Sequence, residues 1–301
     1  MKKGTIPTLI AVLVAAFWQT AWGQVEPQRL TVFASILPQS YFLERIGGDR
    51  VQVEVLVGEG QSPHTYEPTP KQMARLNEAR ALFLIGVGFE RGLMKKIGRS
   101  HGDLLLVETQ TGVPMRSLAG GGHANDESIH GSRLSGGGAA TPDPHIWMSP
   151  RLAKIVAQNI HEALCRLDPA HSRQYAGNLQ SLLDDLDRVD ARIARTLAPL
   201  RGRKMYVFHP AFGYFADAYG LTQVPVEFEG KEPGARQLAG LIDRARADGV
   251  RVIFVQPQFS GKSAAVVAAA IGGAVIPINP LSRDYLANLE AMASAVEQGL
   301  R

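Results

Sequence analysis

The chain has 301 residues, of which 45% are hydrophobic and 20% are charged, and its formal net charge at pH 7 is +4. This length and apolar content are sufficient for one large domain or for two domains of ordinary size. Because no basic cluster alternates with aromatic residues, the composition argues against a nucleic-acid-binding protein.

The first 23 residues have the three parts of a secretory signal peptide. Lys2 and Lys3 form a basic start, an apolar run covers residues 6–18, and residues 21–23 (AWG) place small residues at a cleavage site. The apolar run is short for a membrane span of about 20 residues, so an uncleaved anchor helix is the weaker alternative. Since no cysteine follows the run, we expect an exported, soluble protein without a lipid anchor.

Apolar runs alternate with helical patterns along the rest of the chain. Seven such runs indicate strands, at residues 30–36, 51–57, 81–87, 104–109, 205–210, 250–256 and 274–279. Several are continuous runs of Val, Ile and Leu, which are typical of parallel strands buried on both faces. Because helical segments lie between them, the pattern predicts an α/β fold with parallel sheets.

Two features divide the chain. Residues 117–142 are rich in Gly, Ser and His and lack an apolar period, which indicates a mobile surface loop. Residues 168–200 have an apolar stripe at helical spacing and predict one connecting helix of roughly 45 Å. A helix of that length is long for one small domain. We therefore expect an N-terminal lobe over residues 24–167 and a C-terminal lobe over residues 201–301, joined by this helix.

Three of the eight histidines share one kind of position. His64 follows the run 51–57, His145 directly precedes a helical segment, and His209 lies at the end of the run 205–210. In parallel α/β sheets, such strand-to-helix positions converge at the carboxyl edge, where ligands bind. Each histidine is also next to a proline, which lowers the entropy cost of fixing its side chain. Three neutral imidazoles and one further ligand make a tetrahedral zinc site, although imidazole also suits copper, iron and nickel.

The other five histidines carry a weaker signal. We expect surface or structural roles for three of them, and loose metal binding or plain solvation for the two in the Gly-rich loop. They are His101, His161 and His171, and His123 and His130 of the loop.

Longer motifs surround the three histidines and close the chain. They read GQSPHTYEPTPKQM around His64, DPHIWMSP around His145, VFHPAFGYFADAYGL around His209 and NPLSRDYLANLEAM from Asn279. In this order they resemble the periplasmic zinc- and manganese-binding proteins of ABC metal-uptake transporters, over nearly the whole chain after the signal peptide. The resemblance implies two (β/α) lobes joined by a rigid long helix. It also implies a metal held in the cleft between the lobes, by His64 and His145 from one lobe and His209 from the other.

The resemblance also bears on the identity of the metal. Members selective for manganese tend to carry a carboxylate at the position of His209, so this chain resembles the zinc-binding members. Imidazole is the softer ligand and favours zinc on physical grounds as well.

The closing motif departs from the family pattern. Members commonly place an Asp ligand before Pro-Leu, whereas this chain has Asn279, whose amide oxygen is neutral. Three neutral imidazoles would leave the charge of the metal uncompensated, which is costly in a buried site. Bound hydroxide or water, Glu67 or Glu229 are the candidates to offset it. Asn279 is then either a weak oxygen ligand or a residue that holds a water, and we expect lower affinity than in an Asp-bearing relative.

The resemblance therefore implies a monomeric binding protein, not an enzyme, that captures Zn²⁺ in the periplasm and delivers it to an inner-membrane ABC permease. The main alternative is the same fold carrying Mn²⁺, Fe²⁺ or another transition metal. A zinc-dependent hydrolase is a further alternative, because three histidines with an open position can activate water, but the sequence shows no obvious general base. An adhesin is the last, and the missing lipid-anchor cysteine weakens it.

Overall fold

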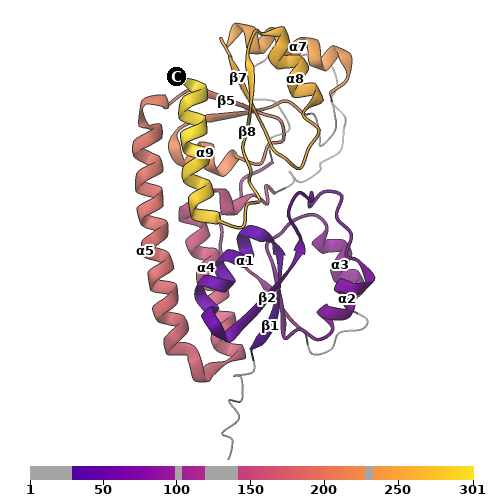
Figure 1. Cartoon of the computed structure of the whole chain (residues 1–301), viewed down its shortest axis with the longest axis vertical. Helices are drawn as coiled ribbons and strands as arrows, with labels where there is room; N and C mark the ends of the chain where they lie inside the picture. Colours follow the sequence, from indigo (N-terminus) through magenta and orange to yellow (C-terminus); the bar gives the residue numbers. More distant parts are fainter. Residues whose placement is uncertain (1–28, 99–103, 119–141, 228–232) are drawn as a thin grey trace, which may run out of the picture.

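The computed structural model describes residues 29–98, 104–118, 142–227 and 233–301. Two four-stranded sheets form the centres of two α/β lobes (Figure 1). The N-terminal sheet has the order β2-β1-β3-β4, with β1 (Leu30–Ile36), β2 (Val51–Val57), β3 (Ala81–Leu84) and β4 (Leu105–Glu108). The C-terminal sheet has the order β6-β5-β7-β8, with β5 (Lys204–Val207), β6 (Thr222–Pro225), β7 (Val252–Val255) and β8 (Ala274–Pro277). All pairings in both sheets are parallel, which confirms the predicted fold class.

The strands follow the apolar runs, with two differences. Five of the seven observed strands that correspond to these runs are shorter than the runs themselves. The last apolar residues of these runs belong to the loops that leave the carboxyl edges of the sheets. The sequence did not indicate β6, whose four residues TQVP are partly polar and end in a proline. Proline cannot donate to a ladder, so it is tolerated in an edge strand such as this one.

Helices pack around each sheet and connect successive strands. The N-terminal part contains α1 (Leu37–Gly47), α2 (Pro70–Leu76), α3 (Glu90–Ile97) and α4 (Pro150–Leu167). The C-terminal part contains α6 (Gly213–Tyr219), α7 (Ala235–Ala247), α8 (Lys262–Ala270) and α9 (Tyr285–Leu300). Short 3₁₀ turns lie at Gly48–Arg50, Ile146–Met148, Pro169–His171 and Ala198–Leu200.

The predicted connecting helix is present as α5 (Ser172–Leu197), with a 3₁₀ turn at each end. Figure 1 shows α5 running along one side of both lobes, with α9 beside it, and α5 also contacts α1 and α4. Its apolar stripe is buried, and one hydrophobic cluster continues from the N-terminal sheet through α4 and α5 to α9. The two lobes therefore share a core along α5, which keeps the edges of the two sheets in a fixed relation.

Several predictions fall outside the described residues. They are the signal peptide, His101, the central part of the Gly-rich loop at 119–141 with His123 and His130, and Glu229. The loop begins and ends at one place, because Ser117 and Pro142 form an antiparallel bridge. Within the described ranges, none of the helices has the length and apolar character needed to cross a membrane. The lobe boundaries at 24–167 and 201–301 stay predictions.

Candidate metal centre

The structure brings His64, His145 and His209 together between the carboxyl edges of the two sheets. A potential ligand nitrogen of each ring lies within 4.8 Å of the corresponding atoms of the other two. The Nε2 atoms of His64 and His209 are 3.0 Å apart. Zinc–nitrogen bonds of about 2.1 Å in a tetrahedron place ligand nitrogens about 3.4 Å apart. The three side chains are therefore close to the spacing that a zinc ion requires.

His64 lies on a loop that is fixed at both ends. The helix that follows the loop starts with a capping box, in which Thr69 is the N-cap and Gln72 completes the reciprocal pair. The Gln72 side chain also donates to the Leu56 carbonyl in β2, at 2.9 Å. Nearer the histidine, the His64 backbone N–H donates to Ser62 Oγ at 3.3 Å. These bonds tie the loop to the strand it leaves.

His145 is oriented by a buried carboxylate two residues earlier in the chain. Asp143 Oδ1 lies 2.7 Å from the ring Nδ1 and also accepts the His145 backbone N–H at 3.0 Å. Because a carboxylate accepts hydrogen bonds, the proton of the neutral ring is on Nδ1 and the Nε2 lone pair is free to bind a metal. Asp143 is fully buried and His145 is 6% exposed, so the pair is shielded from solvent.

His209 has the same kind of support in the other lobe. Its Nδ1 lies 2.8 Å from Oε1 of Glu227, and both side chains are buried. Gln256 exchanges two hydrogen bonds with the His209 backbone, at 3.1 and 2.6 Å. The ring of Phe259 stacks on the imidazole with centroids 4.7 Å apart and planes at 24°. A carboxylate behind a metal-binding imidazole sets its tautomer and strengthens it as a donor.

Two of the three imidazoles have pKa values below the usual histidine range. Desolvation beside the cavity, followed by repulsion from the rings of His209 and His145, lowers the pKa of His64 to about 4, although the residue keeps an exposed surface. Burial also lowers the pKa of His145, against the opposing effect of Asp143. Both rings are therefore neutral at physiological pH, which is the form that binds a metal.

The buried carboxylates are not those that the sequence suggested. Glu67 is exposed on the His64 loop and, among the described residues, does not line the cavity at the histidines, while Glu229 is outside the described residues. Asp143 and Glu227 instead place two negative charges directly behind two of the rings. Sequence reasoning missed both. The DPH motif contained a signal for Asp143, whereas Glu227 follows the unpredicted strand β6.

Asn279 is engaged elsewhere. Its Oδ1 accepts hydrogen bonds from Nε2 of Gln258 at 2.9 Å and from the backbone N–H of Leu281 at 3.0 Å. It is not one of the described residues that line the histidine cavity, and it faces a separate surface depression. The structure thus brings the three predicted histidines together and leaves the Asn279 oxygen bound to other partners.

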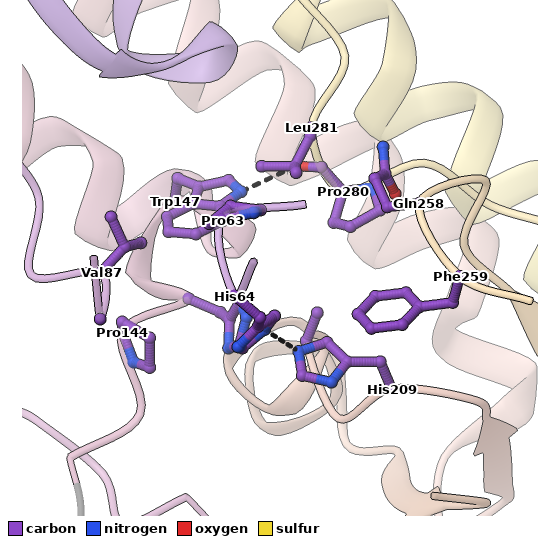
Figure 2. A pocket seen from close by; sticks show the side chains of 13 residues that line it. Pro63, His64, Val87, Pro144, Trp147, His209, Gln258, Phe259, Pro280 and Leu281 are labelled. Atoms are coloured by element: carbon purple, nitrogen blue, oxygen red, sulfur yellow. Dashed lines mark hydrogen bonds between the residues drawn. The ribbon is translucent and has the colours of Figure 1, made fainter. Parts of the chain in front are cut away.

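A small cavity adjoins the histidines, and Figure 2 shows His64 and His209 directed toward one another at its edge. Its volume is about 30 Å³, which is enough for an ion and a water molecule and too small for an organic substrate. Most of its wall is apolar. The apolar lining residues are Pro63, Val87, Pro144, Trp147, Ala211, Phe259, Pro280 and Leu281.

Contacts beside the cavity hold the lobes together. The indole Nε1 of Trp147 donates to the Pro280 carbonyl at 2.8 Å, across the cleft between the lobes. The Arg116 guanidinium lies 3.4 Å from Asp143 and 3.2 Å from Asp217 of α6. The contacts of Trp147 with Pro280 and of Arg116 with Asp217 join the N-terminal lobe to the C-terminal lobe beside the histidines.

Comparison with known proteins agrees with this arrangement. The family model described as the periplasmic component A of the zinc-uptake complex, ZnuA, matches residues 32–299. The high-affinity zinc uptake system protein ZnuA of Bacillus subtilis is 30% identical over 260 residues, covering 84% of this chain and 79% of that protein. A crystal structure of ZnuA has a TM-score of 0.81 and 39% identity, covering 91% of this chain and all of that one. A ZnuA deletion mutant with zinc bound has a TM-score of 0.81 and 40% identity, covering 91% of this chain and 98% of that one.

Proposed function

The chain belongs to the family of ZnuA, the periplasmic component of zinc-uptake complexes, and from this membership we propose that His64, His145 and His209 are its zinc ligands. The protein binds Zn²⁺ as the solute-binding component of ABC zinc uptake. In our proposal it is exported to the periplasm by the signal peptide at residues 1–23, works as a monomer, and passes the ion to an inner-membrane ABC permease.

One observation supports this ligand set above all. The three imidazoles come from both lobes, their ligand atoms lie within 4.8 Å of one another, and two of them are backed by buried carboxylates. Histidine nitrogens in this arrangement are typical zinc ligands, and the supporting carboxylates are typical of zinc sites as well. The absence of a carboxylate at position 209 favours zinc over manganese.

We propose that the protein binds the ion and catalyses no reaction. A zinc hydrolase needs an organic substrate beside the metal, and a cavity of about 30 Å³ has no room for one. The apolar wall also offers no second acid or base beside the histidines among the residues described as lining it.

The experiment is metal counting on the exported form. The protein is dialysed against equal zinc and manganese, and both metals are measured by elemental analysis. We expect one zinc per chain in the wild type and none in a variant with His64, His145 and His209 all replaced by Ala. A matched double variant, His161→Ala with His171→Ala, removes two histidines outside the site and should keep the zinc.

Two results would refute the proposal. One is a wild-type protein that retains no metal, and the other is a triple variant that still holds its zinc. Circular dichroism of the metal-free proteins separates a lost ligand set from a lost fold.

A further inference from the structure

Gln258 is the remaining polar group at the cavity. Among the described residues that line it, Gln258 alone has a side-chain oxygen. That oxygen, Oε1, is buried and has no hydrogen-bond partner within the described part of the chain. Buried acceptors without a partner are rare in folded proteins, and each one calls for a physical explanation. Gln258 lines both the metal cavity and a neighbouring depression at the His64 loop, and a donor that arrives with the metal would satisfy its oxygen from the cavity side.

The orientation of the Gln258 amide is determined by its neighbours. The backbone N–H of Leu281 can only donate, so the atom of Asn279 that it meets must be the oxygen, Oδ1. The same Oδ1 lies 2.9 Å from the Gln258 amide, so the Gln258 atom that faces it must be the NH₂ group. The Gln258 Oε1 is therefore turned away from Asn279. Asn279 thus acts on Gln258 and fixes which end of its amide is left free.

The Gln258 segment is also held against the C-terminal histidine. The next residue, Phe259, stacks on the ring of His209. Figure 2 shows Gln258 and Phe259 on the side of the cavity opposite Val87 and Pro144. The stacking of Phe259 on His209 therefore fixes the position of the neighbouring Gln258 relative to this proposed ligand.

We propose that Gln258 holds the fourth ligand of the bound metal, a water molecule, by accepting a hydrogen bond at Oε1, and that Asn279 positions Gln258 for this role. The inference rests on the proposed function. A metal polarises its bound water and makes it a strong donor, whereas a neutral amide oxygen is not among the usual zinc ligands. The cavity has room for an ion and one water. The C-terminal lobe then contributes two groups, His209 directly and Gln258 through the water, although position 279 has no carboxylate.

The first test is Gln258→Leu, which keeps the bulk of the side chain and removes the acceptor. We expect the zinc affinity, measured by competition with a chelator, to fall by about tenfold, as is usual when a group behind a metal ligand is removed. The visible spectrum of the Co²⁺-loaded protein should change as well, because the hydrogen bond to the fourth ligand is lost. Gln180→Leu, on the exposed face of α5, is the matched control and should change neither measurement.

Substitutions of Asn279 provide a second, independent test of the role of Gln258. Asn279→Leu should weaken zinc binding in the same direction, because the Gln258 amide loses its anchor. Asn279→Asp should recover most of that loss, since a carboxylate oxygen accepts the same two hydrogen bonds.

Two outcomes would overturn the inference. One is a Gln258→Leu protein with wild-type zinc affinity and Co²⁺ spectrum. The other is an Asn279→Leu protein with wild-type zinc affinity, because the Gln258 amide would then need no anchor to act on the metal. In both cases the wild type still binds zinc and the triple histidine variant does not, so failure here is distinct from failure of the proposed function.

Discussion

Replacing Glu227 by Gln separates the charge of a buried carboxylate from the hydrogen bond it makes. Gln can still accept the proton on Nδ1 of His209, where the native distance is 2.8 Å, but it carries no charge. A metal on the far side of the ring would lie about 7 Å from the carboxylate, counting a zinc–nitrogen bond of about 2.1 Å. At an effective dielectric constant of about 20, a single negative charge attracts Zn²⁺ at that distance by about 5 kcal/mol, which is an upper limit.

Groups behind metal ligands usually contribute 10–100-fold to affinity, or about 1.4–2.7 kcal/mol. Since both partners are buried and water screens them weakly, we expect Glu227→Gln to weaken zinc binding by about 100-fold. The assay is competition with a chelator of known affinity, on metal-free protein at fixed pH and salt. Circular dichroism checks that the fold is retained.

The chain provides a matched control for this prediction. Asp168 holds the Nδ1 of His171 at 2.7–2.8 Å, in the same kind of carboxylate–imidazole pair but away from the cavity. Asp168→Asn should leave zinc affinity unchanged. If Glu227→Gln binds zinc within twofold of the wild type, or if both variants lose affinity equally, the buried charge does not act on the metal.

The remaining predictions concern stability. Leu182→Ala should lower the free energy of unfolding by about 2–5 kcal/mol in urea titrations while zinc stoichiometry stays the same, because Leu182 is fully buried in α5. Trp147→Phe should cost about 1–3 kcal/mol in the same assay, because it removes the hydrogen bond to Pro280 and leaves space in the core. The hydrogen bond from Arg45 holds the pKa of Asp185 below its usual value. A depressed pKa stabilises the fold above the unfolded-state value of about 3.9, and that stability is lost as the pH falls through the folded-state pKa. Asp185→Asn should therefore lower the stability by about 1 kcal/mol or less at pH 7, and the difference from wild type should close below about pH 3.

The sequence was sufficient to predict the fold class and the convergence of the three histidines. Continuous Val/Ile runs are required by strands that helices cover on both faces, so they are visible without tertiary information. The three histidines were found for a similar reason, because the carboxyl edge of a parallel sheet gathers residues that are distant along the chain. Both predictions depend on local pattern alone.

The support of His209 could not be predicted, because it depends on strand register. Val207 of β5 pairs with Pro225 of β6 and with Phe254 of β7. Two residues beyond each partner lie Glu227 and Gln256, the groups that bind the side chain and the backbone of His209. Without β6, nothing in the sequence connected position 227 with position 209. A register between predicted strands would have identified this carboxylate, whereas composition and spacing could not.

The carboxylates behind the histidines explain how an amide can be present at position 279 in place of a carboxylate. The sequence suggested that the proposed site lacked negative charge, because only residues that could touch the metal were counted. A carboxylate behind an imidazole offsets the charge of the ion through the ring and occupies no coordination position. Two such groups, Asp143 and Glu227, offset the charge of Zn²⁺, and the Arg116 guanidinium beside Asp143 adds one positive charge to this balance. Asn279 accepts the hydrogen bonds of Gln258 and Leu281 as a neutral group and, in our proposal, leaves the fourth position of the metal to water.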